Sequence, residues 1–413
     1  MDTPTPANPK TKILVISPWK ERWSLGEGAG VSDDYHFIEN LTKKGFELHF
    51  IVPKGGEQKE LGFENLFFHT YPNFFDAMSG WPTALKRIIW PLAFWTLVSV
   101  RALVVGRRLQ PHFVLGHSHY ATVPAYMCRE LLRVPSGVKL FGVMDLVHTE
   151  WSRLKYYYKN LEHILAMKVP QDVWIILDDG TSGREAAIRH GVPSDKIRFL
   201  PNGINIEWAA QTYERTRVRE ELSIPKQAKV VLFLARLVTS KRPQLLIHSI
   251  REVVGNLNDP VLCLIAGDGP ERVRCESLVR RLQIEDHVRF LGTVPHQRVP
   301  EIMAASDVFA STSRLTNAAI PTCEAMVCGL PVVAFDVGNT RAVVRHDETG
   351  LVVPDGDIEA LARGIVELLS DNPRRLKMSD KSRSVAIETF TAWDDRVATE
   401  IDTIRSLIAR ESP

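Results

Sequence analysis

Short apolar runs rich in valine, isoleucine and leucine recur along the chain and alternate with longer segments of mixed polarity. Such runs are typical of strands buried on both faces of a parallel sheet, and the segments between them are typical of covering helices. The pattern predicts an α/β protein with these strands: 12–17, 47–52, 112–116, 139–144, 174–177, 197–200, 229–234, 261–266, 288–291, 308–310, 330–335 and one more before Pro354.

This rhythm is interrupted once, near the middle of the chain. Pro201-Asn202-Gly203 is a turn signal, and the mixed polar stretch 207–226 resembles a linker. A chain of 413 residues is longer than one hydrophobic core usually serves. We therefore expect two Rossmann-like domains facing a cleft, at residues 1–205 and 206–390.

The stretch 311–354 holds a polar loop, a short helix and a buried strand. Pro321 suits the first turn of a helix, and Gly329 suits its end. The loop 315–320 would then feed a helix N-terminus, which attracts anions. Glu324 in that helix can accept two hydroxyl protons from a sugar ring, which suggests a phosphate-bearing ligand with a ribose. The alternative is an ordinary strand-to-helix connection with a surface glutamate.

A second glycine-containing loop follows the first predicted strand, and it includes Gly28, Ala29 and Gly30. A strand, a glycine loop and a helix, here at 32–44, let the backbone approach a ligand closely. The spacing is not GxGxxG, so a dinucleotide fingerprint is not supported. Ligand contact and simple turn chemistry both stay open for these glycines.

Polar side chains follow two further predicted strands of the first half. The candidates for acceptor contact, hydroxyl binding or a catalytic base are His117, His119, Asp145, His148 and Glu150. Each is equally compatible with a satisfied or solvated loop residue. No carboxylate or cysteine lies at metal-ligand spacing beside the first two histidines, so we expect no metal.

The segment 88–100, IIWPLAFWTLVSV, is apolar on all sides and is bracketed by lysine and arginine. It is shorter than the roughly 20 residues that span a bilayer. Pro91 is expected to break its helix or to start it. Two interpretations stay open: a core helix that covers the sheet, or an interfacial patch at 81–108 on an anionic membrane surface.

Composition narrows the class further. The net charge of +2 gives no reason to expect a nucleic-acid partner. The five cysteines lack CxxC spacing, which argues against a disulfide framework or a zinc site and fits a reducing cytoplasm. The polar, proline-rich start of the chain is predicted to be a disordered lead-in and not a signal peptide.

Arg236 and Lys241 follow the first predicted strand of the second half. A planar guanidinium and a point-charge ammonium at one strand end suit a pyrophosphate. Taken singly, each cation is typical of a solvated surface. Their joint occurrence with Gly267 and Gly269, and with the segment 290–294, favours a site.

In its whole order of motifs the chain resembles the retaining glycosyltransferases of family 4, which have the GT-B fold. The resemblance is strongest over 229–354. Its motifs are the Gly28–Gly30 loop, PNGIN at 201–205, ARLVTSK at 235–241, AGDGPE at 266–271, VRFLGTV at 288–294, SDVFASTS at 306–313, CEAMVCGLPVVAFDVGNT at 323–340 and ETGLVVPDGD at 348–357.

The resemblance implies a nucleotide sugar held by the C-terminal domain and an acceptor held by the N-terminal domain. Carried over by position, Arg236 and Lys241 would bind the diphosphate, Thr293 and Val294 would contact the base, and Glu324 would bind the ribose. The last helix, in 391–413 from about Trp393, would cross back to the N-terminal domain. The NDP-sugar would be a co-substrate, and no cofactor or metal is expected.

Two positions depart from the family pattern. The first glutamate of a Glu-x7-Glu pair is here Thr316, followed by Asn317, Ala318 and Ala319 in place of a Gly-Phe-Gly run. This puts the donor sugar and the role of that glutamate in question. The usual His-Gly pair of the acceptor side is Phe141-Gly142, which leaves His148, and then His119, as candidates for its histidine.

The sequence thus predicts a metal-independent, retaining transfer of a sugar from an NDP-sugar to a hydroxyl of a glycan or lipid-linked glycan. Arg236, Lys241 and the amides of 316–319 would stabilise the leaving diphosphate. A cytoplasmic protein, peripheral on the inner face of the plasma membrane, is expected. The alternatives are a catalytically degenerate nucleotide-sugar-binding partner, which Thr316 favours, and a GT-B fold epimerase.

Overall fold

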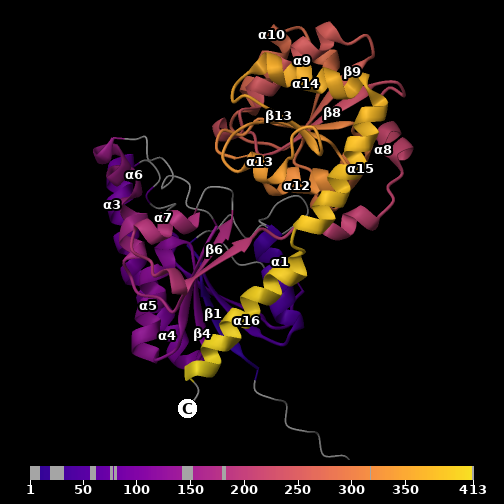
Figure 1. The fold of residues 1–413 in the computed structure, drawn as a ribbon. Coiled ribbons are helices and arrows are strands. Elements are labelled where there is room, and N and C mark those ends of the chain that lie inside the picture. Colours follow the sequence, from indigo (N-terminus) through magenta and orange to yellow (C-terminus); the bar gives the residue numbers. More distant parts are fainter. Residues whose placement is uncertain are drawn as a thin grey trace, which may run out of the picture.

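The structure is a computed structural model that describes residues 10–18, 32–55, 62–74, 78, 81–141, 152–178, 183–316 and 318–411. It contains two separate parallel sheets, each covered by helices on both faces, and the two units are joined near residues 202–228 (Figure 1). The predicted α/β class with two Rossmann-like units is confirmed.

The first sheet has seven parallel strands in the order β3-β2-β1-β4-β5-β6-β7. The central strand β1 pairs with β2 on one side and with β4 on the other, so that Ile16 lies beside both Ile51 and Gly116. The bounds of the strands are β1 Lys12–Ile16, β2 Glu47–Pro53, β3 Leu66–Tyr71, β4 Phe113–His117, β5 Ser136–Leu140, β6 Val173–Asp178 and β7 Ile197–Pro201.

Two hydrophobic cores lie on the two faces of this sheet. One core takes its side chains from α3 to α7, and the other takes them from α1 and from the last helix, α16. The helices of this unit are α1 Ser32–Lys43, α3 Thr83–Ala93, the π-helix η3 Phe94–Val98, α4 Ser99–Leu109, the 3₁₀ turn η4 His119–Ala121, α5 Thr122–Leu132, α6 Arg153–Met167, α7 Gly183–Arg189 and the 3₁₀ turn η6 Ser194–Lys196.

The second sheet has six parallel strands in the order β10-β9-β8-β11-β12-β13. Their bounds are β8 Lys229–Leu234, β9 Val261–Ala266, β10 Val288–Gly292, β11 Val308–Ser311, β12 Val332–Phe335 and β13 Gly350–Val353. The covering elements are η7 Ile206–Ala210, α8 Arg215–Glu221, η8 Thr239–Lys241, α9 Pro243–Asn256, α10 Arg272–Arg281, η9 Glu285–His287, η10 His296–Arg298, α11 Val299–Ala305, α12 Ile320–Val327, α13 Thr340–Val343, α14 Ile358–Ser370 and α15 Asn372–Thr389.

The last helix, α16 (Trp393–Glu411), leaves the second unit and packs on the first, against α1 (Figure 1). At its start the ring of Trp393 lies so close to Gly203 that a Cβ on that glycine would approach it to 2.3 Å. The turn at 201–203 therefore needs a glycine for a packing reason, because any side chain would displace the tryptophan.

A buried ionic cluster fixes α16 on the first sheet. Lys139 of β5 lies 3.1 Å from Oε1 of Glu400, and Arg396 lies 2.8 Å from Oε2 of the same carboxylate. All three side chains are excluded from solvent, and the ammonium also lies over the ring of Phe37. Buried charges are tolerated only when they are paired in this way.

Several sequence predictions of local structure need correction. The stretch 55–83 has no clear periodicity, and no strand was predicted there, yet it contains the edge strand β3. β5 lies at 136–140 and not at 139–144, and the expected linker contains η7 and α8. Pro91 lies inside α3, and the chain stays helical through a π-turn to Leu109. Pro91 lacks a backbone N–H, so it cannot make the usual bond to the carbonyl four residues before it, yet the helix continues past it.

Candidate donor and acceptor sites

Glu324 is buried in α12, behind the carboxyl end of β11. Two side chains from other elements meet its Oε1 atom: Asn205 donates from Nδ2 at 3.1 Å, and Nε2 of His296 lies at 3.0 Å. Both contacts fall on one carboxylate oxygen. The carboxylate predicted to bind the ribose is therefore held in a fixed orientation by groups that the sequence pattern did not single out.

The charge of His296 depends on this contact. Burial by itself lowers the pKa of the imidazole, but the hydrogen bond and the negative charge of Glu324 outweigh burial and raise the pKa above its ordinary value of 6.5. The ring also lies 5.1 Å from the ring of Trp208. The imidazole thus carries more positive charge near neutral pH than an isolated histidine would.

Arg236 and Lys241 lie in the loop after β8, at the carboxyl edge of the second sheet. Arg242 anchors this loop, since its guanidinium donates to the carbonyls of Thr312 and Ser313 at 2.8 Å each. The hydroxyl of Thr312 donates back to the carbonyl of Lys241 at 2.8 Å. The two predicted cations are therefore joined to the loop that leads into α12.

Arg236 is exposed, and its side chain makes no ion pair or hydrogen bond within the described part of the chain. An exposed guanidinium at a strand end is available to a phosphate ligand. Lys241 is half-buried in the turn η8.

Gly267 and Gly269 pack closely against the backbone segment that carries Arg236. Their φ angles are 130° and 156°, and a Cβ at either would come within 2.4 Å of a carbonyl oxygen, that of Ala235 or of Leu237. The amide of Leu237 donates to the carbonyl of Asp268 at 2.9 Å. These glycines let two loops approach each other, and their predicted contact with the donor stays a prediction.

The departure from the family pattern lies next to the start of α12. Thr316 is buried, and its hydroxyl accepts a hydrogen bond from the amide of Ala318 at 3.0 Å. Ala319 precedes the first residue of the helix, and Pro321 lies in its first turn, as predicted. The threonine thus engages one of the amides that were expected to face the diphosphate.

Of the base-contacting candidates, Thr293 is exposed and Val294 is half-buried, both directly after β10. The chain then turns into η10, which begins at His296. The predicted base contact and the observed contact to Glu324 therefore come from one short segment.

The acceptor-side histidines lie at the end of β4. His117 is buried, with Nδ1 3.7 Å from Oδ1 of the equally buried Asp34 in α1. His119 is buried just beyond the strand, and its ring stacks on the ring of His163 from α6 at a centroid distance of 3.4 Å. The two histidines therefore have different surroundings, one toward α1 and one toward α6.

One group of side chains has the donor set of a metal site. Ligand atoms of His119, Glu162 and His163 lie within 4.8 Å of one another, and the hydroxyl of Tyr120 donates to the glutamate at 3.1 Å. Two imidazoles and a carboxylate suit a transition metal. Neighbours of His119 along the chain give no sign of this set, because Glu162 and His163 come from α6.

The remaining predicted site residues, namely Gly28, Ala29, Gly30, Asp145, His148, Glu150 and Asn317, lie outside the described residues.

The apolar segment at 81–108 is both a core helix and an exposed face. Phe94, Val98 and Ala102 are buried against the sheet. The opposite face exposes Leu85, Ile89, Leu92, Leu97, Val100 and Val104.

The stretch Ile89–Leu109 is long and apolar enough to cross a membrane by length and composition, with 44% of its most apolar window buried in the protein. The expectation that it is too short to span is thus corrected, and both earlier interpretations stay open for different faces.

A cavity of about 130 Å³ lies between the two units. Asp178 and Asn202 line it from the first unit, and Ala318 and Cys323 line it from the second. The carboxyl edges of both sheets therefore meet at one place, where parallel α/β sheets bind their ligands.

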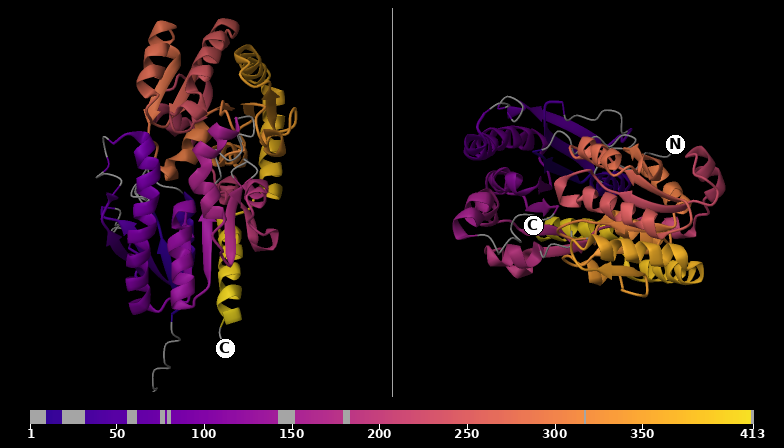
Figure 2. Two further views of the ribbon diagram at one scale, coloured as in Figure 1. Left: turned by 90° about the vertical axis from the view of Figure 1, so that its left-hand side faces the viewer. Right: turned by 90° about the horizontal axis from the view of Figure 1, so that it is seen from above.

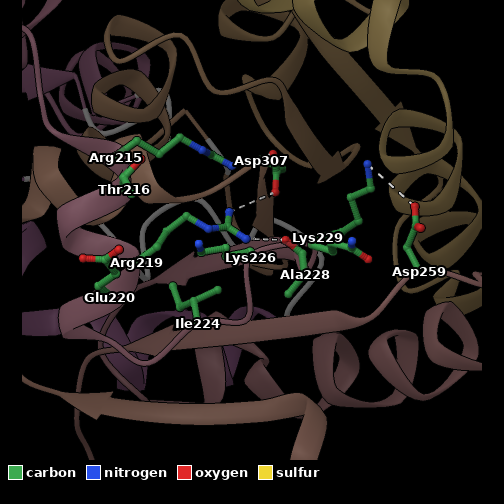
Figure 3. A pocket seen from close by; sticks show the side chains of 11 residues that line it. Arg215, Thr216, Arg219, Glu220, Ile224, Lys226, Ala228, Lys229, Asp259 and Asp307 are labelled. Atoms are coloured by element: carbon green, nitrogen blue, oxygen red, sulfur yellow. Dashed lines mark hydrogen bonds and ion pairs between the residues drawn. The ribbon is translucent and has the colours of Figure 1, made fainter.

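A larger cavity, of about 670 Å³, lies elsewhere, at the amino end of β8 (Figure 3). Its arginines already have partners: Arg219 donates to the carbonyls of Ala305 and Ala228, and Arg215 pairs with Asp307 at 2.9 Å. These cations hold α8 to the second sheet, and we assign the cavity no part in the chemistry.

Two parallel sheets whose carboxyl edges meet, with a cation pair, a helix start and a buried carboxylate at the edge of one, have the arrangement of the GT-B fold. Residues 214–385 match the family model for glycosyl transferases group 1. The second unit of the chain, which carries this match, belongs to the group 1 glycosyltransferases, as the sequence motifs indicated.

Named relatives agree with this assignment. The chain is 24% identical over 383 residues to N-acetyl-alpha-D-glucosaminyl L-malate synthase of Bacillus anthracis, covering 90% of this chain and 92% of the relative. It is 26% identical over 392 residues to a phosphatidylinositol N-acetylglucosaminyltransferase component of Arabidopsis thaliana, covering 94% and 82%. Its fold is similar to that of HepE of Anabaena, solved with UDP and glucose, with a TM-score of 0.70, 20% identity and coverage of 97% and 99%.

Proposed function

We propose that this glycosyltransferase moves a sugar from an NDP-sugar to a hydroxyl group, with retention of the anomeric configuration. The observation that carries the proposal is the bonding of Arg242 and Thr312, which joins the loop of Arg236 and Lys241 to the loop before α12. Two cations, a helix start and the Glu324 carboxylate thus belong to one sheet edge. HepE, a structural neighbour, was solved with UDP and glucose, which supports a nucleotide-sugar donor.

In the proposed reaction the ribose hydroxyls bind the carboxylate of Glu324, and the base lies against the segment of Thr293 and Val294. The bond between the anomeric carbon and the diphosphate oxygen breaks. Arg236 and Lys241 stabilise the negative charge that develops on the departing diphosphate, and oriented charges of this kind are often the largest catalytic contribution. The acceptor oxygen bonds to the anomeric carbon on the same face of the sugar, and its proton passes to the departing diphosphate.

The proposed acceptor is a glycan or a lipid-linked glycan at the inner face of the plasma membrane. The exposed stripe of α3, η3 and α4 supports this, because it is apolar along its length and ends in Arg107 and Arg108. One relative carries phosphatidylinositol in its name. In this proposal the protein is cytoplasmic and attaches peripherally through residues 81–108.

A panel of UDP-, GDP- and ADP-sugars, screened by thermal shift, tests the donor assignment, since a ligand that binds the native state raises Tm. We expect one nucleotide class to raise the Tm of the wild type and to leave the Tm of Glu324→Ala unchanged. Product analysis then separates the alternatives. A degenerate binding partner gives a shift without product, and an epimerase releases a changed NDP-sugar without acceptor. No shift with any donor would contradict the proposal.

A further inference from the structure

Helix α6 carries an exposed apolar stripe that is not explained by the core of the protein. Five large side chains on it are solvent-exposed: Leu154, Tyr157, Tyr158, Leu161 and Leu165, with Leu154 at 85%. Their spacing of three or four residues places them along one face of the helix. Of the eighteen large apolar side chains exposed in the described part of the chain, five are on this stripe and six are on α3, η3 and α4.

Cations border the stripe on α6. Arg153 and Lys155 are exposed in the first turn, and Lys168 is exposed directly after the last turn. The acidic residue of the helix, Glu162, accepts a hydrogen bond from Tyr120 at 3.1 Å. An apolar face with flanking cations and tyrosines has the composition that binds the interface of an anionic bilayer.

The opposite face of α6 reaches the acceptor side. His163 stacks on His119 at the end of β4, and Ile164 and Met167 belong to the core beneath the helix. The same helix therefore presents one face to solvent and contacts the predicted acceptor-binding residues with the other. A surface that held α6 would lie close to the acceptor side.

The two apolar stripes lie on one side of the first unit. α4 packs on α5, and α5 packs on α6. The left view of Figure 2 looks onto this side, where the helices of this layer stand next to one another. Between the two stripes, α5 exposes Leu131. A flat, fluid partner can contact the whole layer, whereas a single bound helix would cover only one stripe.

We propose that α6 is a second membrane-docking helix, which enters the interfacial zone of an anionic bilayer together with α3, η3 and α4. Docking through α6 brings the lipid surface to the helix that touches His119, so that a lipid-borne hydroxyl reaches the acceptor side without leaving the membrane. The inference rests on the proposed function only in its choice of a lipid-borne acceptor, because docking itself requires no donor and no turnover.

Sedimentation of the full chain with vesicles tests the inference. The vesicles are phosphatidylcholine alone, or phosphatidylcholine with about one third phosphatidylglycerol, a composition that adds the negative surface charge to which Lys and Arg are attracted. The variants are Leu161→Glu with Leu165→Glu, and separately Lys155→Glu with Lys168→Glu. The matched control is Leu376→Glu on α15, which is also about half exposed, at 51%, but lies on the other unit.

We expect the wild type and the control to bind the anionic vesicles, with binding weakened by salt. Each cation near the surface contributes about 1 kcal/mol, so the double lysine variant should bind at least about 25-fold more weakly. The double leucine variant should bind the anionic vesicles at least about tenfold more weakly than the wild type. Donor-induced Tm shifts should be unchanged in both, which separates a failure of docking from a failure of the proposed function.

Two results would overturn the inference. One is wild-type binding in the double leucine variant, with an unchanged melting curve. The other is the absence of wild-type binding to anionic vesicles. If centrifugation then also shows a dimer that the leucine substitutions dissociate, the stripe binds a second copy of the chain and not a membrane. If the leucine variant unfolds, the lysine variant decides independently, because it leaves the apolar stripe intact.

Discussion

The Nε2 atom of His296 lies 3.0 Å from Oε1 of Glu324, although the two residues come from different elements, η10 and α12. Asn205 donates to the same oxygen. Within the part of the chain that the structure describes, both of these side chains therefore contact the same oxygen of the carboxylate. This arrangement links the protonation of a histidine to the carboxylate that the proposal assigns to the donor ribose.

Glu324→Gln should lower the pKa of His296. The negative charge that raises this pKa is removed, while the burial that lowers it remains. An NMR titration of the imidazole protons measures the change directly. Thr293→Ser, three residues before the same histidine in the sequence, serves as the control and should leave the titration unchanged. An equal pKa in wild type and Glu324→Gln would show that the contact is not formed in solution.

His296→Ala should reduce stability in a pH-dependent way. Because the pKa in the folded protein lies above 6.5, the histidine contribution is fully present below pH 6.5 and is lost as pH rises through the folded value. Urea unfolding from pH 5.5 to 8.5 should show that the free energy of unfolding differs between wild type and His296→Ala, and that this difference decreases as the pH rises. The difference should stay within about 1 kcal/mol, since the imidazole is partly open to solvent. A difference that increased with pH would contradict a raised pKa of His296 in the folded protein.

Thr316→Glu should change the preferred donor sugar and leave the preferred nucleotide base unchanged. The substitution restores the first glutamate of the family pattern and removes the hydroxyl that engages the Ala318 amide. A hydrogen bond to a charged group contributes about 1.5–3 kcal/mol, so the ratio of kcat/KM between two sugars should move at least about tenfold. Thr316→Ser keeps the hydroxyl and should behave as wild type. An unchanged ratio would remove this position from donor selection.

Glu400→Ala should destabilise the protein by about 3–5 kcal/mol, because Lys139 and Arg396 would lose their buried counter-charge. Urea unfolding of the purified variant measures the loss. Asp402→Ala changes an exposed acid on the same helix and should stay within about 0.5 kcal/mol of wild type. If both variants unfold alike, the cluster does not anchor α16.

Much of the fold follows from local sequence, because the central strands are short, continuous apolar runs. β8 and β9 lie where the pattern placed them. β3 was missed because an edge strand is half-exposed, and LFFHTY lacks a clear alternation. β5 was displaced because its buried Lys139 looks like a surface residue until Glu400 of a distant helix is known.

The candidate site was also predictable only in part, because some of its contacts join residues that are far apart in the sequence. Arg236, Lys241 and Glu324 follow strand ends and belong to recognisable motifs, so position alone singled them out. His296 and Asn205 have no spacing signal, since their partner is 28 and 119 residues away. The one available hint was the turn signal at 201–203 within PNGIN, which marked Asn205 without giving its role. Similarly, the sequence of α6 shows only a basic, tyrosine-rich segment, because the exposure that defines the stripe depends on how the helix packs.

Turnover of a nucleotide sugar by Lys241→Ala tests the assignment of the donor site. We expect kcat to fall about 100-fold or more, because a cation that stabilises the leaving diphosphate is removed. Lys226→Ala, at the amino end of β8, removes an equal charge from the far side of the second sheet and should turn over as wild type. Unchanged turnover in Lys241→Ala, with the fold intact, would contradict the assignment of this edge as the donor site.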